Sequence, residues 1–255
     1  MFKIVLQSAL CVVVLVAAAA RADQPWTFGN NTRYLALGDS LAAGYGAMPA
    51  TNGYTYQLYQ QGVFDKVSNT LFANAAMPGA TSEDVLHYQV PQVHHFLSSE
   101  HPAAPTVITL SVGGNDLIAL LNDILNGPPV PDVPAALFAL SLRLEAILAA
   151  LCSEAPAARI YIGNLYTIHN FPVSTDDIVA GFNFFLGRAV ANANAPASCN
   201  GRVRIADVFA AFGGTEGPQQ GLLLVNRNGA GRFEVHPTNA GYRAMASAYK
   251  AAHAP

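Results

Sequence analysis

The sequence predicts a flavodoxin-like, three-layer α/β/α domain around a mainly parallel five-stranded sheet. Five short apolar runs are spread between residues 34 and 206, and runs of this kind are typical of parallel strands covered on both faces. Longer segments with helix-start and helix-stop residues separate or follow them. Strands that alternate with helices form βαβ units, whose right-handed crossovers place helices on both faces of the sheet.

The individual elements are predicted from local signals. The strands are expected at residues 34–37, 70–73, 106–110, 159–162 and 203–206. The helices are expected at 116–126, from just after Asp132 to about 151, from 174 or 175 up to Pro196, and from just after Thr238 to about 253. Pro134 suits the first turn of the second helix, and Asp176 and Asp177 near the start of the third favour its dipole.

Composition excludes two classes of protein. Of the 255 residues, 52% are hydrophobic and 11% charged, with 13 basic and 16 acidic side chains. So low a charge density excludes an intrinsically disordered chain. A formal net charge of −3 without a run of Lys or Arg provides no phosphate-binding surface, so no nucleic-acid partner is expected. No repeat or linker divides residues 23–255, which we expect to form one domain.

Residues 1–22 are predicted to be a cleaved signal peptide. A positive start at Lys3 precedes an unbroken apolar stretch over 9–20, and Ala20 and Ala22 are the small residues that signal peptidase reads. The stretch is well short of the roughly 20 residues that span a bilayer. We therefore expect an exported protein, secreted or periplasmic, without an integral membrane segment in its mature chain.

Export determines how the cysteines are interpreted. Once Cys11 is removed with the signal, Cys152 and Cys199 remain as a pair in an oxidising compartment. We predict a disulfide between them, with two separate buried thiols as the alternative. Two cysteines without histidines at ligand spacing make no zinc site, so no metal is expected.

Polar motifs follow three of the predicted strands and precede the last helix. They are Gly-Asp-Ser-Leu at 38–41, Gly79, Gly-Gly-Asn-Asp at 113–116 and His-Pro at 236–237. Chemistry in such a sheet gathers at the carboxyl ends of the strands. We therefore expect these four loops at one edge of the sheet.

The residue types in these loops suit ester hydrolysis. A serine hydroxyl such as that of Ser40 is a weak nucleophile until a neutral imidazole, here His236, accepts its proton. The tetrahedral intermediate needs fixed donors, which the N–H groups of Ser40 and Gly79 and the amide of Asn115 would supply. Glycine at position 79 also lets a substrate approach the backbone closely.

These four motifs, in this order, resemble the SGNH hydrolase superfamily, also called GDSL lipases and esterases, over the whole expected domain. The resemblance implies Ser40 as nucleophile, His236 as general base, and an oxyanion hole from Ser40, Gly79 and Asn115. It implies the strand order 2-1-3-4-5 and requires no cofactor. In that order the fourth and fifth strands are neighbours, so a Cys152–Cys199 bridge would lie at the opposite, amino edge.

The sequence departs from this family at the catalytic acid. The family usually places an aspartate three residues before the histidine, but Phe233 stands there and Glu234 lies only two residues before it. Either Glu234 reaches the imidazole through a shifted backbone, or a main-chain carbonyl near Phe233 holds the ring in a Ser–His dyad. Two other aspartates are assigned to structure: Asp39 to the turn that presents Ser40, and Asp116 to capping the following helix.

Three functions are compatible with these residues. The first is a secreted carboxylester hydrolase that acts on lipid or short acyl esters through an acyl-enzyme on Ser40. The second is a polysaccharide O-acetyl esterase of the same fold, and the third is a non-catalytic binding domain, which would be expected to lack Ser40 or His236. An apolar helix around 135–148 is expected to border an acyl pocket and so favours the first. The oligomeric state is left open.

Overall fold

The computed structural model describes residues 33–61, 71–97, 106–168, 174–195, 197–224 and 235–254. The predicted signal peptide lies outside the described residues, as do Phe233 and Glu234. The four functional motifs, the two cysteines of the expected domain and all five predicted strands lie within them, apart from Thr70 at the start of the second strand.

Five parallel strands form one sheet in the order β2-β1-β3-β4-β5. They are β1 Arg33–Gly38, β2 Leu71–Asn74, β3 Thr106–Ser111, β4 Arg159–Gly163 and β5 Val203–Ala206. Each agrees with its predicted range to within one residue at either end, and the implied 2-1-3-4-5 order is confirmed.

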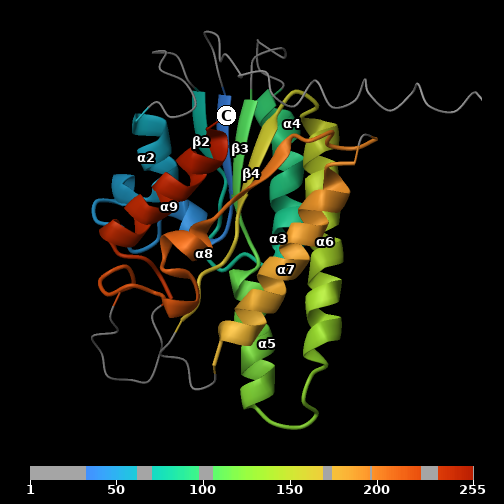
Figure 1. The fold of residues 1–255 in the computed structure, drawn as a ribbon. Helices are drawn as coiled ribbons and strands as arrows, with labels where there is room; N and C mark the ends of the chain where they lie inside the picture. Colours follow the sequence, from blue (N-terminus) through green and yellow to red (C-terminus); the bar gives the residue numbers. More distant parts are fainter. Residues whose placement is uncertain are drawn as a thin grey trace, which may run out of the picture.

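Helices cover both faces of the sheet (Figure 1). One face carries α3 Ser82–Asp84, a π-helical turn Val85–Gln89, α4 Val90–Leu97, α5 Gly114–Leu125, α6 Val133–Glu154 and α7 Asp176–Ala193. The other carries α1 Ser40–Ala43, α2 Tyr54–Gln60, α8 Val208–Ala211 and α9 Asn239–His253. Short 3-10 turns lie at Ala50–Asn52 and Gly214–Glu216. The three-layer α/β/α prediction is therefore confirmed.

The two cores are separated by the alternation of side chains along the strands. In β1, Leu35 and Leu37 pack into the core beneath α4–α7, whereas Tyr34 and Ala36 pack into the core beneath α2 and α9. Successive residues of a strand point to opposite faces, so one buried strand contributes to both cores. The edge strand β2 is different, because none of its residues is fully buried. The prediction that each strand is covered on both faces was therefore wrong for β2.

The four predicted helices correspond to α5, α6, α7 and α9, and each boundary agrees to within about three residues. Asp132 caps α6 by accepting a hydrogen bond from the Ala135 N–H, and Thr238 caps α9 in the same way through the Gly241 N–H. The short helices α2, α4 and α8 were not predicted. Helices of one or two turns depend on tertiary packing for their stability, so their local sequence signal is weak.

Helix α6 is long and apolar enough to cross a membrane by length and composition. Eight of its 22 residues are buried, however, and they belong mainly to the core shared with the sheet and α7. This burial is typical of the central helix of a folded domain.

The predicted disulfide is present. Cys152 near the end of α6 is bonded to Cys199, which lies shortly before β5, with 5.3 Å between their Cα atoms. Both cysteines precede a strand, so the bridge lies on the amino side of the sheet, away from the loop that carries Ser40. It closes a loop with a sequence separation of 47 residues, for which chain entropy predicts a stabilisation of about 4 kcal/mol.

Candidate active site

Ser40 is presented by a tight turn at the carboxyl end of β1. It is the first residue of α1, and the residue before it, Asp39, is the N-cap. The Leu41 N–H donates to the Asp39 carboxylate at 3.0 Å, and the Asp39 N–H donates to the carbonyl of Ser111 on β3 at 3.0 Å. Asp39 thus holds the turn, as predicted, and leaves the Ser40 hydroxyl without a capping role.

The carboxyl group of Asp39 is buried beneath this turn. Burial raises the pKa of Asp39 to about 7, against the opposing effect of hydrogen bonds from Leu41 and Ser111. Burial therefore disfavours the ionised form of Asp39, and the contribution of this side chain is to hold the turn by hydrogen bonds.

Gly38 allows β1 to approach β3 at the point where the turn begins. Its φ is +126°, and a Cβ atom there would lie 1.9 Å from the carbonyl oxygen of Ser111. The buried side-chain amide of Gln89 pairs with both backbone groups of Gly38, accepting from its N–H at 2.6 Å and donating to its carbonyl at 2.7 Å. Gln89 could not be predicted from the sequence, because a single glutamine in a helical segment has no distinctive pattern.

His236 lies against Ser40, although 196 residues separate them in the chain. The distance from His236 Nε2 to Ser40 Oγ is 2.9 Å, within hydrogen-bonding range. The ring of Tyr45 packs on the imidazole, with the ring centroids 4.5 Å apart. The predicted acid Glu234 lies outside the described residues, so its place beside His236 remains a prediction.

The loops that carry Gly79 and Asn115 are joined directly. Asn115, in the first turn of α5, donates from Nδ2 to the carbonyl of Ala80 at 2.8 Å. Gly79 is exposed with a φ of +86°, and within the described residues no heavy atom beyond its chain neighbours lies within 4 Å of the position that a Cβ would occupy. The backbone of Gly79 is thus open to an approaching substrate.

The prediction that Asp116 caps α5 was wrong. The N-cap residue is Gly113, and the Asp116 carboxylate instead accepts hydrogen bonds from the N–H and Oγ of Ser82 at 2.9 and 2.6 Å. Arg143 of α6 completes the group, donating to Ser82 Oγ at 2.8 Å and pairing with Asp116 at 3.4 Å. Asp116 lies inside the first turn of α5 and therefore does not occupy the N-cap position. Its carboxylate instead links α5 to Ser82, in the segment that follows Gly79.

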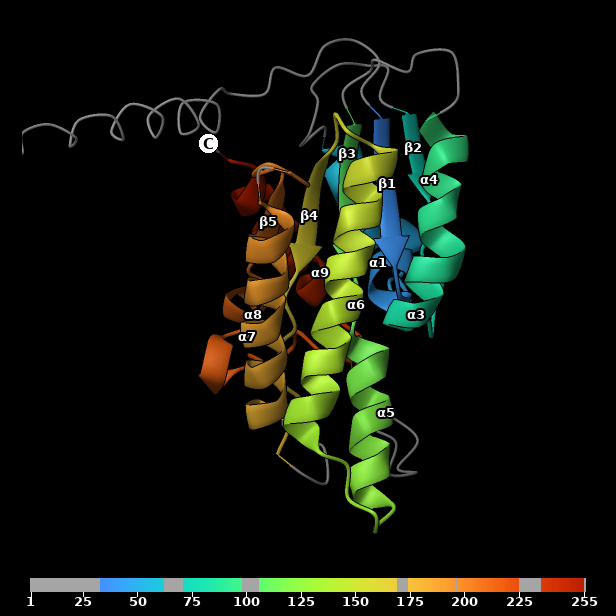
Figure 2. The same ribbon diagram turned by 90° about the vertical axis from the view of Figure 1, so that its right-hand side faces the viewer.

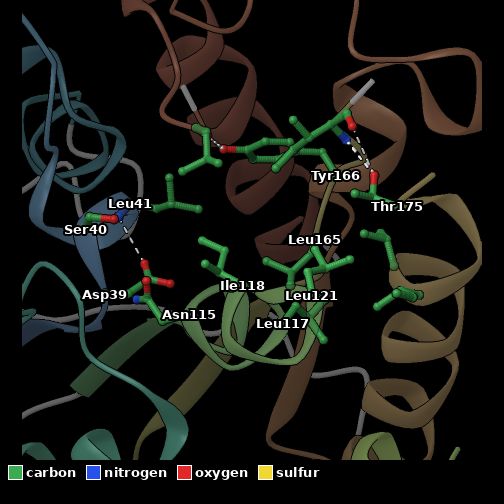
Figure 3. Close-up of a pocket in the computed structure, with 15 residues that line it drawn as sticks. Asp39, Ser40, Leu41, Asn115, Leu117, Ile118, Leu121, Leu165, Tyr166 and Thr175 are labelled. Atoms are coloured by element: carbon green, nitrogen blue, oxygen red, sulfur yellow. Dashed lines mark hydrogen bonds between the residues drawn. The ribbon is translucent and has the colours of Figure 1, made fainter. Parts of the chain in front are cut away.

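An apolar pocket opens beside Ser40 (Figure 3). The pocket has a volume of about 630 Å³, including the part that is open to solvent. Ser40, Asp39 and Asn115 lie at one end, and Tyr166 and Thr175 lie at the other. The residues that line it are Asp39, Ser40, Leu41, Gly114, Asn115, Leu117, Ile118, Leu121, Leu165, Tyr166, Ile168, Thr175, Ile178, Val179 and Val235.

The walls of this pocket differ from those predicted. They come mainly from α5, from α7 and from the segment after β4, with Leu41 and Val235 beside the catalytic end, and no residue of α6 lines the pocket. Helix α6 packs along α7 instead (Figure 2), and its buried apolar residues belong to the core. The apolar pattern of α6 therefore reports core packing, not substrate contact.

No group of three or more His, Cys, Asp and Glu side chains in the described part of the chain could hold a metal ion.

A match to a known protein family covers the residues that form this site. The sequence matches the model of the GDSL-like Lipase/Acylhydrolase family over residues 36–244. No curated protein sequence matches significantly.

Several solved structures share the fold. A lipase from a goat rumen metagenome is 22% identical with a TM-score of 0.63, over 87% of this chain and 97% of that chain. A phospholipase A1 from Streptomyces albidoflavus NA297 is 18% identical with a TM-score of 0.58, over 89% of this chain and 100% of that one. A variant of an acetyl-xylooligosaccharide esterase from Geobacillus is 18% identical with a TM-score of 0.57, over 89% and 96%. At these identities the likeness shows the fold alone.

Proposed function

Since the chain belongs to the GDSL-like Lipase/Acylhydrolase family and is a carboxylester hydrolase, we propose that it cleaves esters of apolar acyl groups through an acyl-enzyme on Ser40. The observation that carries this proposal is the 2.9 Å distance between His236 Nε2 and Ser40 Oγ. It places a base within reach of the proton that the serine must lose.

In the proposed reaction, His236 accepts the Ser40 proton as Oγ attacks the ester carbonyl. The carbonyl oxygen gains negative charge, and His236 returns the proton to the departing alcohol as the acyl-enzyme forms. Water then attacks the acyl-enzyme while His236 accepts its proton; the bond from the acyl carbon to Oγ breaks, the carboxylic acid leaves, and His236 returns the proton to Ser40. Both steps use the same imidazole, so the geometry that serves the first also serves the second.

We propose that the oxyanion is held by the N–H groups of Ser40 and Gly79 and the side-chain amide of Asn115. Two observations support this assignment: the backbone of Gly79 is open to a substrate, and the Asn115–Ala80 hydrogen bond restrains the Asn115 amide. Fixed donors need no reorganisation when charge develops, and one such donor is typically worth a factor of about 10²–10³ in turnover.

The pocket favours an apolar acyl chain over an acetyl group. Leu117, Ile118, Leu121, Ile178 and Val179 line it from two helices, and an acetyl group would leave most of that surface without contact. Each methylene buried there would contribute roughly 0.8 kcal/mol. A polysaccharide O-acetyl esterase is the second candidate, supported by the fold shared with the acetyl-xylooligosaccharide esterase.

A hydrolysis profile on p-nitrophenyl esters from acetate to palmitate, run beside acetylated xylan, tests the substrate. We expect kcat/KM to rise from acetate to medium-length chains, because added methylenes bury apolar surface in the pocket. A maximum at acetate with release of acetate from xylan would favour the second candidate. A protein that hydrolyses none of these substrates would contradict the proposed function.

We propose Glu234 as the third member of the catalytic group. Glu234→Gln is then expected to lower kcat at least about 100-fold, because an amide cannot stabilise the imidazolium that forms as Ser40 loses its proton. Glu216→Gln is a matched control, since Glu216 lies exposed in a 3-10 turn. A Glu234→Gln enzyme within tenfold of wild type would instead support a main-chain carbonyl and a Ser–His dyad.

We also propose that the protein is exported after cleavage of residues 1–22. The Cys152–Cys199 disulfide supports this, because such bonds persist in oxidising compartments. N-terminal sequencing of the exported protein should begin at Asp23.

A further inference from the structure

The segment at 165–168, directly after β4, is held by hydrogen bonds to separate parts of the fold. Three of its four residues form hydrogen bonds of 2.8–3.1 Å with residues that lie between 7 and 50 positions further along the chain. The partners are Asn183 of α7 for both backbone groups of Leu165, Gly217 for Thr167, and Thr175 for Ile168. A backbone held at this many points is a rigid support.

The remaining residue of the segment, Tyr166, extends from this support toward the loop that carries His236. Its ring stacks on Phe212, with centroids 4.2 Å apart and an interplanar angle of 7°. Its hydroxyl donates to the carbonyl of Val235 at 2.5 Å. Tyr166 is only 5% exposed, and the hydrogen bond itself is partly buried.

Val235 directly precedes His236, so the bond from Tyr166 acts one residue away from the proposed base. On its other side the same loop is held by an isolated antiparallel bridge between Leu223 and Pro237. Within that bridge the Leu224 N–H donates to the His236 carbonyl at 2.9 Å. The backbone of His236 is therefore fixed between two supports, one of which is a single side chain.

We propose that Tyr166 is a positioning residue for His236: its hydroxyl fixes the Val235 carbonyl and thereby keeps the imidazole in line with Ser40. This inference rests on the proposed function. Small displacements of a catalytic group lower the rate sharply, because proton transfer requires the base within hydrogen-bonding distance. Tyr166 also lines the pocket. Its ring and its hydroxyl therefore have separable roles, the ring as part of the pocket wall and the hydroxyl as the support of Val235.

Tyr166→Phe separates the two roles, because it keeps the ring and removes only the hydroxyl. We expect kcat to fall about tenfold, as for the loss of one well-placed hydrogen bond, with KM changed less than about twofold. The factor should be the same for p-nitrophenyl acetate and octanoate. The rate of covalent inactivation by a fluorophosphonate, which reports Ser40 activation directly, should fall in parallel.

Tyr249→Phe is the matched control. The Tyr249 hydroxyl is also buried and also donates to a backbone carbonyl, that of Leu110 at 2.8 Å, but Leu110 lies within β3 and not beside His236. It should lose thermal stability to a similar degree and keep its kcat. An equal loss of kcat in both variants would overturn the positioning role, as would a Tyr166→Phe enzyme within twofold of wild type. A loss that depends on acyl length would assign Tyr166 to the pocket instead.

Two further measurements keep the test decisive. If Tyr166→Phe does not fold, Phe212→Leu removes the stacking partner and keeps the hydroxyl. It should lower kcat by a smaller factor, again independent of acyl length, and an unchanged kcat would overturn the proposal. Ser40→Ala separates this inference from the proposed function: an active Ser40→Ala enzyme contradicts the function itself, whatever Tyr166 does.

Discussion

Replacing Ser40 with alanine is expected to lower ester turnover by several orders of magnitude and to leave the fold intact. Ser40 Oγ is the atom that His236 Nε2 contacts, at 2.9 Å. Without it no acyl-enzyme can form, and single knockouts of such a nucleophile cost up to about 10⁶ in kcat. The turn should survive, because its hydrogen bonds come from Asp39 and not from the serine hydroxyl.

The measurement is kcat on a p-nitrophenyl ester, with the melting temperature and fluorophosphonate labelling of the same preparation. Ser247→Ala is the control, since that exposed hydroxyl donates to the carbonyl of Arg243, one turn earlier in α9. It should match wild type in all three assays. A Ser40→Ala protein that retains a tenth of wild-type turnover would contradict the nucleophile assignment.

Gly38→Ala is expected to have the largest effect on stability. The new Cβ would lie 1.9 Å from the Ser111 carbonyl oxygen, and the φ of +126° is one that alanine rarely adopts. Gly38 pairs with Ser111 in the register of two central strands, so neither backbone can move without disturbing the sheet. We expect a loss of about 4 kcal/mol or more, or no folded protein.

Gly187→Ala provides the control for this prediction. Gly187 lies within α7, and no heavy atom is within 4 Å of its added Cβ. Alanine is the better helix former, so this variant should match or exceed wild type by up to about 1 kcal/mol. Chemical denaturation of the two variants side by side measures the difference, and equal stabilities would contradict the proposed close packing at Gly38.

Gly38 and Ser40 are close in the sequence but have different roles. Gly38 allows β1 to end against β3, and Ser40 is then held outward by the capped turn. Any Gly38→Ala protein that does fold should therefore also lose activity, because the turn that presents Ser40 would be displaced. Ser40→Ala should lose activity alone.

Much of the architecture was predictable because it depends on local patterns. Each central strand is a short apolar run, and the run alone specifies burial on both faces. Parallel strands bring their carboxyl ends to one edge, so the loops at Ser40, Gly79 and Asn115 could be assigned to one site before their contacts were known. The disulfide was predicted from an even pair of cysteines in a chain that we expect to be exported.

Only the tertiary structure decided which segments far apart in the chain contact each other. Gln89 reaches Gly38 across 51 positions and Tyr166 reaches Val235 across 69, and neither residue belongs to a local motif. The apolar pattern of α6 led us to expect that it borders the pocket, yet α5, α7 and the segment after β4 line it and α6 does not. An apolar pattern specifies that a helix face is buried but not against which neighbour, because burial is non-directional. Which surfaces meet is decided by the packing of whole elements, and that information is not present in any single stretch of sequence.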